Sequence, residues 1–213
     1  MDWCGQIIGD DRSWGTAGAA RHLIVGQDGA AGPETGPLIP DPLPAQSRSF
    51  TLPALGGIAA ADRLALIGFQ SLNPHWDGVA VIVGESATIW ATLSAREVIH
   101  QQASATPRLA AALGLNGAGV EGLETALDRP ERLTLLLADA TSEAAQLGAL
   151  LGAEIGATRT LWLGQQAVLI GGGPLVRGYG TALQAAHVPV TMTERRGLLQ
   201  KGFEALAAAF PEG

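Results

Sequence analysis

The stretch VLIGGGPLVRGYGTALQAA (residues 168–186) sets three consecutive glycines between an apolar run and a helical pattern. An unbroken apolar run before glycines is typical of a strand covered on both faces, so residues 167–170 are predicted to be a buried strand. Pro174 suits a first helical turn, since its φ is already helical and it has no N–H to leave unpaired. Four apolar side chains then recur at helical spacing: Leu175, Tyr179, Leu183 and Ala186. The sequence therefore predicts a strand, a glycine turn and a helix.

This glycine turn has two interpretations. A turn without Cβ atoms lets a ligand approach the backbone, and it directs the first amides of the following helix at that ligand. Nucleotides and phosphates are the usual occupants of such turns. The alternative is a tight strand-to-helix connection whose glycines serve only close packing. The spacing is not that of the dinucleotide fingerprint, because Val176 stands where that motif has a glycine.

The composition indicates a globular protein. Of the 213 residues, 47% are hydrophobic, which is enough for one large domain or two small ones. The formal net charge is −7 and Lys201 is the only lysine, whereas a nucleic-acid surface needs clustered basic residues. A single cysteine, Cys4, excludes an intramolecular disulfide and favours a reducing compartment. We therefore expect a cytoplasmic protein that binds neither nucleic acid nor a membrane.

The first half of the chain contains a second candidate loop. Residues 33–47 carry five of the 12 prolines and predict an irregular segment, because each proline removes a donor and restricts its predecessor. Residues 58–69 show helical spacing of apolar side chains. Residues 79–83 and 88–93 then predict the two strands of a hairpin, and the hairpin tip at 84–86 is the second candidate phosphate loop.

The second half alternates helices and strands. Residues 142–155 have almost no polar face and predict a buried helix, in which Gly148 and Gly152 permit close approach of another backbone. Three more helices are expected: one at 106–113, one that begins near residue 120 and is interrupted near Pro130, and one at 197–210. A further strand is expected at 188–192. This order predicts an α/β fold with mixed sheets and flanking helices. We expect a reduced N-terminal sub-domain at 1–75 and a C-terminal sub-domain at 76–213.

The segment order in the second half resembles a known family. Leu151, Gly152, Ala153 and Glu154 end a helix, and a strand, the glycine turn and another helix follow. This arrangement is similar to the C-terminal domain of the 2-dehydro-3-deoxygalactonokinase family, which are sugar-acid kinases with the actin-like ATPase fold. The resemblance covers most of residues 52–210 and is strongest after Glu121. It implies an actin-like fold in which the glycine turn lies on the adenosine side of ATP.

The hairpin resembles the same family with substitutions. Members carry a hairpin of the type Pro-Gly-Thr-His-Ser-Lys-Trp near the phosphates of ATP. Aligned on Trp90, this chain keeps both hydroxyls, as Ser86 and Thr88. The family's glycine, histidine and lysine are replaced by Glu85, Ala87 and Ile89. Further along, Arg108 stands where the family has an acid, and upstream Asp62 keeps one carboxylate of a pair, followed by Arg63.

The N-terminus departs most from the family, whose first strand ends in Asp-Trp-Gly-Thr. Here residues 3–8 are predicted to be the strand and residues 9–14 its altered turn, which offers Asp10 and Asp11 as metal-binding candidates. The chain is also shorter than the family norm. The resemblance implies ATP and Mg²⁺ as cofactors and a small sugar acid as substrate, and a homodimer stays open as the assembly.

The candidate site residues follow from this resemblance. They are Gly84, Ser86 and Thr88 for phosphate, Gly171, Gly172 and Gly173 for adenosine, Asp62 and Arg108 for catalysis, and Asp10 and Asp11 for metal. Glu85 and Ile89 make the hairpin less favourable for an anionic γ-phosphate, unless Arg63 or Arg108 points inward. Three functions therefore stay open: an ATP-dependent kinase of a 2-keto-3-deoxy sugar acid, a catalytically degenerate relative with a binding, regulatory or scaffolding role, and an unrelated α/β binding module.

Overall fold

The computed structural model describes residues 2–26, 32–46, 49–117 and 119–209. The chain forms two compact units. The first contains Met1–Asp77, Leu93–Gln101 and Arg195–Gly213, and the second contains Gly78–Thr92 and Gln102–Glu194. The expected division at residue 75 lies close to the first crossing between units. The expected division has two continuous sub-domains. Both units of the structure are discontinuous, because the chain returns to the first unit twice.

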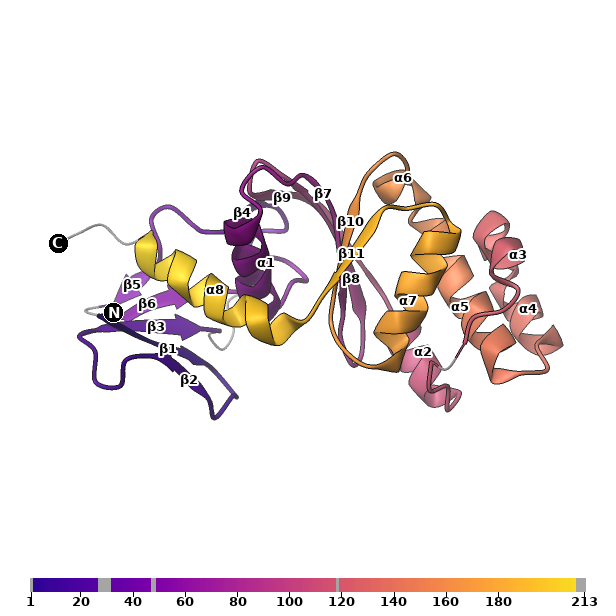
Figure 1. Ribbon diagram of the computed structural model, residues 1–213, viewed down its shortest axis with the longest axis horizontal. Helices are drawn as coiled ribbons and strands as arrows, with labels where there is room; N and C mark the ends of the chain where they lie inside the picture. Colours follow the sequence, from indigo (N-terminus) through magenta and orange to yellow (C-terminus); the bar gives the residue numbers. More distant parts are fainter. Residues whose placement is uncertain (1, 27–31, 47–48, 118, 210–213) are drawn as a thin grey trace. The chain divides into compact units, whose positions relative to one another are not determined.

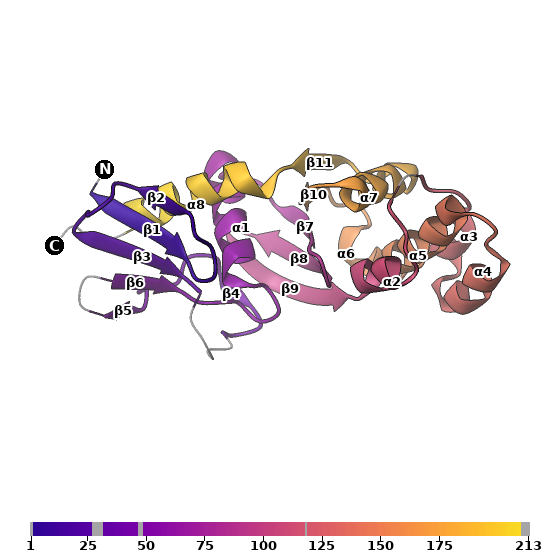
Figure 2. The ribbon, with the colours of Figure 1, turned by 90° about the horizontal axis from the view of Figure 1, so that it is seen from below.

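The first unit is built on a five-stranded sheet. Figure 2 shows its strands side by side in the order β2 (Ser13–Gly15), β1 (Trp3–Ile7), β3 (Arg21–Val25), β6 (Ser49–Leu52) and β5 (Ala45–Gln46). The central strands β1, β3 and β6 are parallel, and the edge strands β2 and β5 are antiparallel to their neighbours. The predicted strand at 3–8 is therefore confirmed as β1.

Two helices of the first unit pack on each other closely. They are α1 (Ala60–Leu72) and α8 (Arg195–Ala208), seen together in Figure 1. A Cβ added at Gly68 would lie 2.0 Å from the carbonyl oxygen of Leu198, and one at Gly202 would lie 2.3 Å from that of Leu64. The two glycines therefore allow the helix backbones to touch.

The second sheet has the strand order β11-β10-β7-β8-β9-β4. Its strands are β4 (Gly36–Pro37), β7 (Gly78–Val83), β8 (Thr88–Ser94), β9 (Glu97–Ser104), β10 (Ala167–Ile170) and β11 (Val190–Thr193). Strand β10 is parallel to both β7 and β11, and all four of its residues are buried. The prediction of a buried strand before the glycine turn is confirmed.

Helix α5 (Glu143–Ala157) is the central helix of the second unit. Figure 1 shows it between α7 (Pro174–Ala185) and the pair α3 (Leu123–Asp128) and α4 (Leu133–Asp139). Residues 147–155 are all buried, which confirms the predicted buried helix. A Cβ at Gly148 would lie 1.8 Å from the carbonyl oxygen of Glu121, so this glycine allows the expected close approach. The unit is completed by α2 (Thr106–Ala112), α6 (Arg159–Trp162) and a 3₁₀ turn at Pro130–Arg132.

The remaining expectations agree with the structure in most places. Within the described part of 33–47, the chain is irregular apart from β4 and β5, and Ser47 lies outside the described residues. The predicted final helix corresponds to α8, although Phe210 also lies outside the described residues. Strand β9 was not predicted. Among the helices that the structure describes, none combines the length and apolar character needed to cross a membrane.

Candidate functional site

The three glycines between β10 and α7 have different structural roles. Gly171 has a φ of +156°, its amide donates to the carbonyl of Thr193 at 3.2 Å, and an added Cβ would lie 2.8 Å from Cγ2 of Val176. An added Cβ at Gly172 or Gly173 would meet no atom within 4 Å. Close packing therefore requires only the first glycine, and the other two present bare backbone to open space.

A small pocket lies at this turn. It has a volume of about 250 Å³ and is lined by the three glycines together with Val176, Arg177, Met192, Thr193 and Glu194. The pocket lies where the parallel strands β10 and β11 end, and the first amides of α7 are at the same place. Ligands of open parallel sheets bind at the carboxyl ends of the strands, and helix N-termini favour anionic groups there.

The hairpin tip lies beside the glycine turn. Strands β7 and β10 are parallel with Ile82 opposite Ile170, so Gly84 and Gly171 follow their strands at the same edge. The tip is closed by a hydrogen bond from the amide of Gly84 to the carbonyl of Ala87 at 2.9 Å. Glu85 and Ser86 are exposed at its end. The structure therefore brings together the two candidate loops that the sequence identified.

Thr88 is placed differently from Ser86. Its side chain is fully buried, and its Oγ1 shares a hydrogen bond of 2.6 Å with the hydroxyl of Tyr179. A buried hydroxyl with a buried partner cannot reach a phosphate at the surface of the turn without losing that bond. Ser86 is therefore the one of the two predicted hydroxyls that is open to a ligand.

A buried carboxylate, Glu154, is the centre of a hydrogen-bond network behind the two loops. It accepts hydrogen bonds from Nε1 of Trp90 at 2.6 Å, from Oγ of Ser104 at 2.7 Å and from the hydroxyl of Tyr179 at 2.7 Å. Within the described ranges no Arg or Lys forms an ion pair with it. Burial and the adjacent negative charge of Glu154 raise the pKa of Tyr179 well above its usual range.

This network links the end of α5 to the hairpin and to the helix after the glycine turn. Trp90 is on β8, Ser104 ends β9 and Tyr179 is on α7. The sequence identified Glu154 only as part of a family motif, not as a hydrogen-bond acceptor. One signal was present, since an acid within the apolar stretch 147–155 indicates a buried polar group with partners.

The two predicted catalytic candidates belong to different units. Asp62 belongs to the first unit and Arg108 to the second, where Arg108 is exposed. Nη2 of Arg195 lies 2.6 Å from Oδ1 of Asp62, although the pair lacks hydrogen-bond geometry. Burial raises the pKa of Asp62, and the charge of Arg195 opposes this shift. The structure therefore gives Asp62 a partner within its own unit.

Arg63 also has a structural environment. Its side chain is 2% exposed, and it donates to the backbone carbonyls of Leu38 at 2.8 Å, Pro53 at 3.0 Å and Pro37 at 2.8 Å. Burial lowers its pKa to about 10. Because these contacts hold the guanidinium within the first unit, Arg63 is not free to replace the missing lysine of the hairpin.

The two metal candidates, Asp10 and Asp11, have different surroundings. Asp10 accepts three hydrogen bonds from the side chain of Arg12, at 2.9, 3.1 and 2.5 Å, and the contacts with Arg12 lower its pKa to about 2. Asp11 is exposed. No group of three or more His, Cys, Asp or Glu side chains suited to a metal ion exists among the residues placed in the structure. Asp10 is therefore engaged by Arg12, whereas Asp11 is open to solvent.

Comparisons with known proteins identify the same family that the order of helices and strands in the second half of the chain resembles. The family model described as 2-keto-3-deoxy-galactonokinase matches residues 127–206. No curated protein sequence matches the chain. A crystal structure of a Sinorhizobium meliloti protein, provisionally assigned as a 2-dehydro-3-deoxygalactonokinase, is similar with a TM-score of 0.71 and 19% identity, covering 89% of this chain and 79% of that one.

A second structure, component A of (R)-2-hydroxyglutaryl-CoA dehydratase from Acidaminococcus fermentans, has a TM-score of 0.44 and 13% identity, covering 68% of this chain and 67% of that one. The matched family segment, residues 127–206, contains α5, the glycine turn and most of α8. The chain is therefore similar to the 2-keto-3-deoxy-galactonokinase family over residues 127–206, and it shares the α/β fold of the Sinorhizobium meliloti structure.

Proposed function

We propose that the chain is a sugar-acid kinase-like protein that binds ATP at the turn formed by Gly171, Gly172 and Gly173. The observation that carries this proposal is the open space over Gly172 and Gly173, where an added Cβ would meet no atom within 4 Å. These two glycines present bare backbone beside the pocket, whereas close packing requires only Gly171. The adjacent pocket and the first amides of α7 provide a place for adenosine and for anionic groups.

The neighbouring hairpin supplies the second part of the proposed site. Gly84 and Gly171 follow adjacent parallel strands, so a nucleotide on the glycine turn reaches the hairpin tip. Ser86 is exposed there and offers a hydroxyl donor to the phosphates. ATP would supply the phosphoryl group, and a 2-keto-3-deoxy sugar acid is the substrate class that the family name suggests. Asp10 and Asp11 stay the candidates for holding Mg²⁺, and no step is assigned to the ion.

ATP binding is tested by calorimetry on the whole chain, with and without Mg²⁺. Gly172→Val places a side chain in the open space, so we expect it to weaken ATP binding while leaving thermal stability unchanged. Gly197→Val is the matched control, because a Cβ there also meets no atom within 4 Å but the residue lies on α8. Equal affinity of the two variants for ATP would contradict the proposed site.

A second candidate function is a catalytically degenerate relative that retains nucleotide binding. Three observations favour it: Thr88 is bonded to Tyr179, Ile89 is buried where the family has a lysine, and Glu85 adds a negative charge at the exposed tip. Loss of one well-placed donor costs on the order of 3 kcal/mol in a transition state, or about a hundredfold in rate. Several such losses together predict very weak phosphoryl transfer.

A coupled assay of ADP release with 2-dehydro-3-deoxygalactonate distinguishes the two candidates. Turnover of roughly 1 to 100 per second, the ordinary range of kinases, supports the active enzyme. ATP binding without measurable turnover supports the degenerate relative. Absence of both removes both candidates and favours an unrelated binding role.

A further inference from the structure

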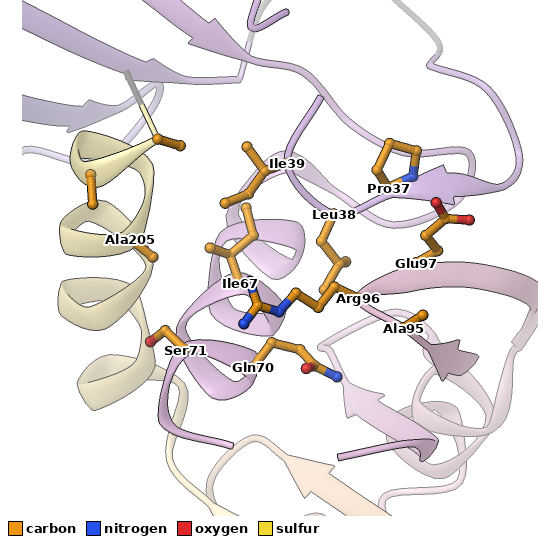
Figure 3. A pocket seen from close by; sticks show the side chains of 12 residues that line it. Pro37, Leu38, Ile39, Ile67, Gln70, Ser71, Ala95, Arg96, Glu97 and Ala205 are labelled. Carbon is orange, nitrogen blue, oxygen red and sulfur yellow. The ribbon is translucent and has the colours of Figure 1, made fainter. Parts of the chain in front are cut away.

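The first unit contains a larger cavity that the proposed nucleotide site does not use. Its volume is about 560 Å³, and it lies among α1, the last residues of α8, the turn between β8 and β9, and residues 37–39 (Figure 3). It shares no residue with the pocket at the glycine turn. Cavities that hold small organic molecules usually have volumes of this order.

The cavity has apolar walls. Leu38 and Ile39 line one side, Ile67 lies on α1, and Ala205 and Ala208 come from α8. The alanines leave room that larger side chains would fill, so the space between the two helices and the loop stays open. Such walls suit the hydrocarbon part of a ligand.

Gln70 supplies a buried acceptor at this cavity. Its side chain is 3% exposed, and its Nε2 donates to the carbonyl oxygen of Trp76 at 2.8 Å. Its Oε1 is buried, with no hydrogen-bond partner among the residues that the structure describes. Figure 3 shows the amide directed into the space between α1 and Ala95. Buried acceptors are almost always paired, so this oxygen calls for a donor from a bound molecule.

Arg96 supplies a cation on the opposite side. It forms the two-residue turn between β8 and β9 with Ala95, and both have positive φ, of 67° and 50°. The turn is held by hydrogen bonds from the amide of Leu38 to the carbonyl of Arg96 at 3.0 Å and from the amide of Ala95 to Oδ1 of Asp77 at 2.9 Å. The Arg96 side chain therefore projects from a fixed position.

The charge of Arg96 is available to an anion. Within the described part of the chain no ion pair involves Arg96. In Figure 3 its guanidinium extends toward Ile67 and Gln70, whereas the carboxylate of Glu97 is directed toward Pro37. One unpaired cation beside an apolar space, in a chain with a net charge of −7, matches a single negative charge.

We propose that this cavity binds a small amphipathic organic anion. Its hydrocarbon part lies between α1 and α8, one carboxylate or sulfonate faces Arg96, and one N–H or O–H group donates to Oε1 of Gln70. A polyphosphate does not suit the cavity, because Arg96 is its single cationic lining residue and Glu97 also lines it. The site is thus chemically distinct from the proposed nucleotide site.

A matched pair of fluorescent probes tests this chemistry on the full chain. 2-Anilinonaphthalene-6-sulfonate has two ring systems, one sulfonate and an N–H donor, and its N-methyl derivative lacks only the donor. We expect saturable binding of one molecule per chain, with a preference for the N–H probe. Gln70→Leu should remove that preference, because the acceptor is gone. An equal affinity of the unmodified chain for both probes would overturn the role of Gln70.

The role of Arg96 is tested with substitutions at two arginines. Arg96→Gln should weaken binding of the N–H probe roughly tenfold or more, as expected for loss of a hydrogen bond to a charged group. Arg196→Gln is the matched control, since Arg196 is exposed on α8 and does not line the cavity. Equal binding by these two variants would overturn the proposal.

The location is tested by filling the cavity. Ala205→Phe should abolish probe binding, and if this variant fails to fold by circular dichroism, Ala208→Phe at an exposed position replaces it. Addition of ATP, or the change Gly172→Val, should leave probe binding unaltered, which separates this site from the nucleotide site. Retained binding in a folded filled variant, or displacement of the probe by ATP, would place the probe elsewhere and refute the inference.

Discussion

The two candidate loops of the second unit follow neighbouring parallel strands, yet their side chains have different surroundings. At the glycine turn, Gly172 and Gly173 present bare backbone to open space. At the hairpin, Thr88 is bonded to Tyr179, and only the tip with Glu85 and Ser86 is exposed. The comparison shows that equal positions at a sheet edge do not give equal access to a ligand. Access depends on which side chains already have partners within the protein.

The largest expected effect comes from removing the carboxylate behind both loops. Glu154→Ala leaves donors of Trp90, Ser104 and Tyr179 without their acceptor in a buried place. We expect the free energy of unfolding to fall by about 3–5 kcal/mol, measured by urea denaturation. Glu154→Gln keeps one acceptor oxygen and should lose less. A similar stability of both variants would mean that the network does not support the loops.

The second-largest effect is a difference in stability between substitutions at Gly171 and at Gly172. Gly171→Ala forces a residue with a Cβ to adopt a φ of +156° and to lie 2.8 Å from Val176. We expect a loss of about 1–3 kcal/mol in unfolding free energy. Gly172→Ala meets no neighbour and should change stability by less than about 0.5 kcal/mol. Urea midpoints of both variants check this order, and a larger loss for Gly172→Ala would reverse the assignment.

A smaller effect is expected at the hairpin. Thr88→Val removes the hydrogen bond to Tyr179 and should cost about 1 kcal/mol of unfolding free energy. Ser86→Ala should leave stability within about 0.5 kcal/mol, since Ser86 is exposed, and should weaken ATP binding instead. Thermal melting and calorimetry on the same samples measure both quantities. If Ser86→Ala left ATP affinity unaltered, the hairpin would have no part in binding.

The smallest effect concerns the partly buried carboxylate of Asp62 in the first unit, which contrasts with the buried Glu154. The folded pKa of Asp62 is raised, so its contribution to stability is complete below the unfolded pKa and is lost as the pH rises through the folded pKa. Asp62→Asn should therefore lack this loss. Relative to the variant, the unmodified chain should become less stable as the pH rises from about 3 to 7, a range that begins near the ordinary pKa of an aspartate. Urea midpoints across that range measure the difference, and an opposite slope would contradict the direction of the pKa shift.

The pattern of apolar residues along the sequence predicted those helices and strands that are buried by their own apolar side chains. The apolar run before the glycines became β10, and the apolar circumference of 142–155 became the buried helix α5. Strand β9 escaped prediction because residues 97–104, EVIHQQAS, show only one buried position and no apolar alternation. Its place in the sheet comes from its neighbours rather than from its own sequence.

The site was predicted only as far as it depends on adjacent residues. The glycine turn and the hairpin tip were both identified, because each is one continuous segment. The partner of Thr88 lies 91 residues away, and nothing in the sequence shows that these two hydroxyls meet. Arg63 was considered as a free cation because arginines are mostly exposed, yet backbone carbonyls from two other segments surround it.

The close packing of α8 on α1 has a consequence for the order of synthesis. Helix α1 ends at Leu72, and the helix that covers it begins only at Arg195. Because ribosomes add roughly 5–20 residues per second, α1 waits on the order of ten seconds for its partner. The second unit has all its described segments by Glu194 and can fold before then. The unit whose segments begin first along the chain is therefore the last to have all its described segments, and α1 stays without its helix partner until then.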